Sequence, residues 1–252
     1  MTSLYNALQA NRLEPKRAAQ SHLVQPSILA TTRTLSLLFC LVTIGIDSSR
    51  NDPSAYHYVM FMTNLSFYTI TSYFMSLTNS KVSAYVTWRT VHQKDFVPWS
   101  GMSCYFFLWH TILYELCVVL TLIVTPIYWG LLAKDDLPGI GDRELYLTIS
   151  MHLFNSVLMW KEIILGKNVF ILTHILVLIP IILLYIPYAL TLKSITGEWA
   201  YFFLNYEDDP VCFTIIVSVI GVYATIAHLA LVKLHEWRDS HFVPKTTNLP
   251  QG

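Results

Sequence analysis

The sequence predicts an all-α membrane protein, built as a bundle of six transmembrane helices. Of its 252 residues, 54% are hydrophobic and 13% are charged, whereas a soluble domain usually has about 25% charged residues. The mean hydropathy is positive. The apolar residues also gather in long runs, each close to the roughly 20 residues that a helix needs to cross hydrocarbon.

The expected spans follow one another closely, with no room for a soluble domain between them. They are residues 28–46, 58–77, 104–129, 145–165, 170–192 and 211–234. Pro180 and Pro187 are expected to bend the fifth span, because proline removes a helical donor and crowds the preceding turn. The chain is therefore divided into an N-terminal tail (1–27), a membrane domain (28–234) and a C-terminal tail (235–252).

The distribution of basic residues predicts the orientation. With six spans, the side that carries both termini would hold twelve of the sixteen Lys and Arg residues, and the opposite side only four. The positive-inside bias then places both termini in the cytosol, in an endomembrane or the plasma membrane. Arg33, near the start of the first span, is expected to snorkel toward water. The net charge is zero, so the expected partner is membrane lipid and not nucleic acid.

The fourth span carries polar side chains that are costly in hydrocarbon and are therefore functional candidates. On a helix, His152 and Asn155 share one stripe. Thr63 in the second span is expected at a similar depth, because these residues lie roughly 10, 15 and 8 Å below the outer surface at ~1.5 Å per residue. In the plain alternative, Thr63 bonds to a carbonyl of the preceding turn and His152 hydrogen-bonds to a neighbouring helix.

A second polar layer is expected near the inner surface. It consists of His110, Glu162, His174 and His228. Imidazole and carboxylate groups at one depth suit zinc or iron, so an intramembrane metal or haem protein is one alternative. The same groups can instead pair with one another to stabilise the bundle. No two of them share an HxxxH-type helix and the cysteines lack a zinc spacing, so no metal and no cofactor is expected.

Several motifs resemble those of a known family. They are Phe61-Met62-Thr63-Asn64-Leu65-Ser66-Phe67, His152-Leu153-Phe154-Asn155, Glu162 and Thr196-Gly197-Glu198-Trp199-Ala200-Tyr201. In order and spacing they are similar to the androgen-inducible family of multi-pass membrane proteins, and closest to its Rolling stone-like and fungal branches. The resemblance covers residues 30–235.

This resemblance implies a threonine hydrolase of fatty acid esters of hydroxy fatty acids. The family's nucleophile matches Thr63, and the first histidine of its His-x-x-His motif matches His152. The family's catalytic second histidine is replaced here by Asn155. The resulting hypothesis is that His152 acts as the base for Thr63, while Asn155 donates a hydrogen bond to an oxyanion.

The resemblance leaves two further points open. Gly197, Trp199 and Tyr201 are expected to cover the substrate entrance at the outer surface, or else to form an interfacial aromatic anchor after a glycine turn. The missing histidine also favours a non-catalytic membrane protein, acting in adhesion, fusion or lipid organisation as the Rolling stone branch suggests.

Overall fold

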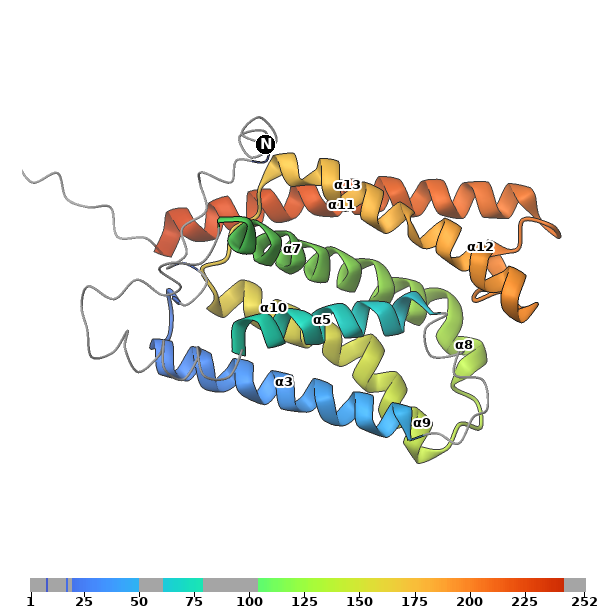
Figure 1. The fold of residues 1–252 in the computed structure, drawn as a ribbon, viewed down its shortest axis with the longest axis horizontal. Helices are drawn as coiled ribbons and strands as arrows, with labels where there is room; N and C mark the ends of the chain where they lie inside the picture. Colours follow the sequence, from blue (N-terminus) through green and yellow to red (C-terminus); the bar gives the residue numbers. More distant parts are fainter. Residues whose placement is uncertain (1–7, 9–16, 18–19, 50–60, 79–103, 243–252) are drawn as a thin grey trace, which may run out of the picture.

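A computed structural model describes residues 8 and 17 and the ranges 20–49, 61–78 and 104–242 (Figure 1). Regular structure in these residues is entirely helical, apart from one isolated β-bridge between Ser21 and Gly166. The expected all-α fold is therefore confirmed.

The helices follow the expected spans closely. In chain order they are α3 (Pro26–Ser48), α5 (Met62–Thr78), α7 (Cys104–Ile127), the π-helical η2 (Tyr128–Leu132), α8 (Ala133–Asp136), α9 (Asp142–Ile149), the π-helical η3 (Ser150–Phe154), α10 (Asn155–Leu165), the 3₁₀ turn η4 (Leu172–His174), α11 (Ile175–Leu183), α12 (Tyr185–Thr196), the 3₁₀ turn η5 (Phe202–Leu204) and α13 (Pro210–Phe242). The last helix runs past residue 234, where the last span was expected to end. Residues 58–60 of the second expected span lie outside the described residues.

Four of the described helical stretches are long and apolar enough to cross a membrane. They are Pro26–Ser48, Phe106–Asp136, Leu172–Thr196 and Pro210–Phe242. Large apolar side chains on them face outward, for example Leu176 with 72% exposure, as expected of a surface that lipid covers. The helix α5 has 17 residues, or about 25 Å at 1.5 Å per residue, which is shorter than hydrocarbon is thick.

The helix α7 is the centre of the bundle. It contacts α5, α10, α11 and α13, and Figure 1 shows it between α11–α13 on one side and α3, α5 and α10 on the other. Its side chains Tyr114, Cys117 and Ile123 are fully buried. The apolar core therefore follows this one helix along its whole length.

The break between α11 and α12 has a local cause. The helix ends at Leu183 and restarts at Tyr185, four and two residues before Pro187. Proline cannot donate to the carbonyl four residues earlier, here that of Leu183, and its ring crowds that turn. The break expected at Pro187 is therefore found at this point, whereas Pro180 lies inside α11, which continues to Leu183.

Charged side chains fill the end of the bundle that holds the start of α3 and the ends of α10 and α13, which we call the ion-pair half. Arg33 is only 4% exposed. It donates from Nη2 to Glu162 Oε2 at 2.7 Å and from Nε to both carboxylate oxygens, at 3.2 and 3.0 Å. The expectation that Arg33 snorkels to water is therefore wrong, because Glu162 offers it a buried carboxylate.

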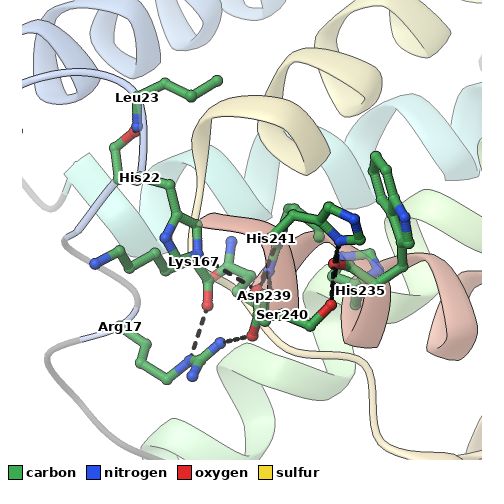
Figure 2. Close-up of polar contacts among 12 residues, drawn as sticks. Arg17, His22, Leu23, Lys167, His235, Asp239, Ser240 and His241 are labelled. Atoms are coloured by element: carbon green, nitrogen blue, oxygen red, sulfur yellow. Dashed lines mark hydrogen bonds and ion pairs between the residues drawn. The ribbon is translucent and has the colours of Figure 1, made fainter. Parts of the chain in front are cut away.

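A second buried arginine ties the loop after α10 to the end of α13. Arg238 donates to the carbonyls of Ile163 and Asn168 at 2.9 and 2.7 Å. Figure 2 shows that Arg17, from the segment before α3, reaches both the Lys167 carbonyl and the Asp239 carboxylate next to it. These contacts join the segment before α3, the loop after α10 and the end of α13 in the ion-pair half.

Candidate functional site

The opposite end of the bundle, near α8 and α9 in Figure 1, contains a cavity of about 350 Å³. We call this end the cavity half. The lining comes from the end of α3, the start of α5, the π-helical segments and the stretch before η5. The lining residues are Asp47, Phe61, Thr63, Asn64, Tyr128, Leu132, Asp136, Leu147, Thr148, Met151, His152, Ala200, Tyr201 and Phe202.

The two residues expected to react, Thr63 and His152, both line this cavity. Thr63 is the second residue of α5 and is 5% exposed. His152 lies in η3 and comes from the other wall. His152 Nδ1 has no hydrogen-bond partner among the described residues. The structure therefore brings the hydroxyl and the imidazole to one hollow space, where a molecule can lie between them.

A π-helical turn positions His152. Its ring stacks on that of Tyr128, with the centroids 3.4 Å apart and the planes at 16°. Tyr128 itself begins the other π-helical segment, directly after Pro126 and Ile127. Single π turns inside α-helices are rare and often occur at functional sites. The two π-helical segments thus contact each other through the stacked rings of Tyr128 and His152.

Thr125 of α7 stabilises the π turn η3, which carries His152. Its hydroxyl donates to the His152 carbonyl at 2.9 Å and lies 2.7 Å from Ser156 Oγ. A carbonyl that leaves the regular helical ladder needs another donor when it is buried. Thr125 supplies that donor and fixes the orientation of the turn that carries His152.

Asn155 is not where the hypothesis needs it. Its side chain is completely buried and does not line the cavity. Its Oδ1 lies 3.3 Å from Thr125 Oγ1, and its Nδ2 has no partner among the described residues. Residues three apart share a stripe in an α-helix, but the wider π turn rotates Asn155 away from His152 and toward α7.

Tyr201 is the residue that the structure places beside Thr63. Both residues line the cavity, and the ring of Tyr201 packs edge to face on that of Phe61, two residues before Thr63, with the centroids 5.5 Å apart. Burial raises the pKa of Tyr201, so the phenol keeps its proton at neutral pH. The sequence indicated only an aromatic residue at the entrance, because nothing local shows that this loop folds onto the start of α5.

Gly197 and Trp199 shape the loop without lining the cavity. Gly197 ends α12 with φ +80° and donates to the Lys193 carbonyl at 2.9 Å, a conformation that favours glycine. The Trp199 ring packs against Tyr206 at 5.4 Å, with Lys193 Nζ 5.6 Å from its centroid. These contacts are those of an aromatic anchor at the end of a helix.

A narrow apolar pocket of about 50 Å³ adjoins the cavity. Thr63, Tyr128, Leu132 and Tyr201 line both spaces. The rest of the apolar pocket is mainly aliphatic and comes from α7, α11 and α13, with Ile123, Ile182, Val217 and Ile220 among its residues. The start of an apolar tail can therefore enter this pocket beside Thr63, while a polar head occupies the cavity.

The four residues of the alternative metal layer do not converge; they are His110, Glu162, His174 and His228. His174 Nδ1 lies 3.0 Å from Glu115 Oε1, and its Nε2 lies 2.9 Å from the Leu8 carbonyl. Glu162 is held by Arg33. Within the described residues, no group of three or more His, Cys, Asp and Glu side chains could hold a metal ion.

Comparison of the chain with protein-family models, with curated proteins and with solved structures gives no match. The resemblance to the androgen-inducible family therefore stays an expectation, and function has to be inferred from the chemistry of the cavity.

Proposed function

We propose that all six helical segments cross a membrane and that both termini lie on the cytosolic side. The two segments that are shorter or more charged, α5 and α9–η3–α10, pack against α3 and α7. The charge of Glu162 in α10 is neutralised by Arg33 of α3. A protease-sensitive tag at either terminus should be cleaved only from the cytosolic side. Cleavage of one tag from each side would show an odd number of spans.

We propose further that the protein is an intramembrane hydrolase of lipid esters. One observation carries this proposal: a hydroxyl and an imidazole from different helices line one cavity, and an apolar pocket leads away from the hydroxyl. A threonine needs a nearby base to become a nucleophile, and His152 is the imidazole in this lining.

The proposed reaction has two halves. In the first, Thr63 Oγ attacks the ester carbonyl carbon while its proton passes to His152. The C–O bond then breaks, and the alcohol leaves with the proton from His152. In the second half, water gives a proton to His152 and attacks the acyl-threonine, which releases the fatty acid and restores the Thr63 hydroxyl.

Tyr201, and not Asn155, is the side chain that can donate to the oxyanion. Its protonated phenol borders the cavity and the apolar pocket next to Thr63, where negative charge develops on the carbonyl oxygen. Preformed donors at such a place stabilise the transition state. Asn155 instead acts through Thr125 and keeps the turn of His152 in place.

The test uses purified protein and a fluorophosphonate probe that labels activated hydroxyl groups. The native protein should be labelled, and Thr63→Ala should not. Thr71→Ala is the matched control, because Thr71 lies on the same helix, is buried and bonds to the Phe67 carbonyl away from the cavity. His152→Ala should slow labelling by about 10²–10⁴-fold, whereas His228→Ala should not.

Two results would overturn the hydrolase proposal. One is a native protein that the probe does not label. The other is labelling that persists in Thr63→Ala, because the reactive group would then lie elsewhere.

A non-catalytic lipid-binding protein is the second candidate, favoured by the position of Asn155 outside the cavity. In that case native protein and Thr63→Ala should retain the same lipid on purification. A hydrolase should instead accumulate intact ester only in Thr63→Ala. Mass spectrometry of the co-purified lipid separates these outcomes.

A further inference from the structure

The charge of the cavity lining is one-sided. Asp47 at the end of α3 and Asp136 at the end of α8 both line it, and no lysine or arginine does so among the described residues. Two described basic residues at this end of the bundle make contacts outside the lining: Arg143 donates to the Ile46 carbonyl and to Ser49, and Lys193 donates to the Gly197 carbonyl. An anionic head in this space would face carboxylates of its own sign.

Aromatic rings form much of the remaining wall. Phe61 and Tyr201 meet edge to face, with centroids 5.5 Å apart and planes at 68°, and Tyr128 and Phe202 also line the cavity. A cation over an aromatic face is attracted by the ring quadrupole, and quaternary ammonium groups are recognised by such aromatic walls. Carboxylates next to aromatic rings strengthen the preference for a positive charge.

The apolar pocket decides how such a ligand would lie. Because Thr63 and Tyr201 border both spaces, an acyl group whose first carbons enter the apolar pocket places the ester at Thr63 and the alcohol portion in the charged cavity. We infer that the ligand is an acyl ester whose alcohol portion carries an ammonium group. This inference rests on the proposed function for the position of the ester. It departs from esters of hydroxy fatty acids, which carry a free carboxylate.

Binding should be measured without hydrolysis, on Thr63→Ala in maltoside micelles, which contain no choline. The probes are palmitoylcholine, 1-palmitoylglycerol, palmitate and free choline. Palmitoylcholine should bind about tenfold more tightly than 1-palmitoylglycerol, as expected for a cation against an aromatic and acidic wall. Palmitate should bind most weakly of the acyl probes, and choline alone should bind weakly because the apolar pocket stays empty.

Asp136→Asn tests the origin of the preference. Asp136 is exposed, so its replacement should leave folding intact and reduce the preference for palmitoylcholine several-fold. Asp135→Asn is the matched control, since Asp135 is the neighbouring carboxylate of α8 and does not line the cavity. Asp47→Asn should act in the same direction as Asp136→Asn.

The outcomes separate this inference from the hydrolase proposal. Equal or tighter binding of palmitate or 1-palmitoylglycerol would overturn the ammonium inference, and so would a preference that survives both Asp47→Asn and Asp136→Asn. Tight binding of free choline would show that the site recognises the ammonium group without an acyl chain, so the ligand would not be an acyl ester. A clear ammonium preference in a protein that the fluorophosphonate probe does not label would support the inference and remove only the hydrolysis.

Discussion

The two ends of the bundle place their functional candidates and their buried charges in different surroundings. In the ion-pair half, Arg33 meets Glu162 at 2.7 Å, and Tyr73 donates to the same carboxylate at 3.2 Å. In the cavity half, Thr63 and His152 face a hollow of about 350 Å³. His152 Nδ1 is buried without a partner in the described part of the chain.

This difference separates structural from functional polar groups. A buried charge that loses its partner is very costly, so a closed network of charges holds helices in place. A polar group that faces a cavity is open to a ligand, which is one explanation for a buried polar atom without a partner. The ring nitrogens of His228 also lack a partner among the described residues, but His228 lines neither the cavity nor the apolar pocket. Changes in the ion-pair half should therefore alter stability, and changes in the cavity half should alter chemistry.

The largest effect is expected for Arg33→Leu. It leaves Glu162 in a fully buried position without its main partner, which costs about 3–5 kcal/mol. For a chain of this length the melting temperature in detergent should fall by roughly 10 °C. Fluorescence-detected thermal unfolding measures the change.

The double variant Arg33→Leu with Glu162→Leu sharpens this test. Removing both charges avoids the uncompensated ion, so the double variant should melt at a higher temperature than Arg33→Leu alone. If it melts lower still, Lys161, whose Nζ lies 3.6 Å from Glu162 Oε1, must depend on the same carboxylate. If Arg33→Leu melts like the native protein, the pair is not structural.

The substitution His152→Phe is expected to raise the melting temperature, by less than Arg33→Leu lowers it. Phenylalanine keeps a flat ring against Tyr128 and removes the unpartnered nitrogen, whose burial costs about 1–3 kcal/mol. The melting temperature should rise by a few degrees while fluorophosphonate labelling is lost. A fall as large as that of Arg33→Leu would make His152 a structural residue and remove the contrast between the two halves.

Most of the helices could be predicted from the sequence, because hydropathy and length are local properties. The ends of α5 and α10 lie within a residue of the expected ends of their spans, 77 and 165. The environment of Arg33 could not be predicted, because its partner Glu162 lies 129 residues away. A lone arginine near a span end looks the same in the sequence whether it snorkels or pairs.

The candidate site could be predicted only in part, because the depth of a residue is a local property and its contacts with other helices are not. Thr63 and His152 were placed at one depth by counting residues, and they do line one cavity. Asn155 was expected beside His152 because an α-helical period was assumed, and the π turn at Ser150–Phe154 breaks that period. Asp47 and Asp136 gave no signal, because acidic residues at span ends usually face water.

The smallest effect is expected for the segment before α3, which packs on the ion-pair half. The His22 side chain is only 3% exposed and lies 3.4 Å from Asp239; Figure 2 shows it beside Lys167 and Arg17. Burial, then Lys167 and more weakly Arg238, lower the pKa of His22 below 6.5, although Asp239 opposes the shift. The folded segment thus holds the neutral imidazole.

Because the pKa of His22 is lowered in the folded segment, acid should weaken the packing of this segment. As the pH falls below about 6.5, the released segment binds the proton more readily than the packed one, so packing weakens until the pH reaches the lowered pKa. Hydrogen exchange at residues 20–24 should therefore quicken a few-fold, relative to its intrinsic rate, between pH 7 and pH 5. His22→Gln should abolish this acceleration, and His241→Gln, which changes an exposed neighbour, should keep it. Acceleration that persists in His22→Gln would assign the effect to another group.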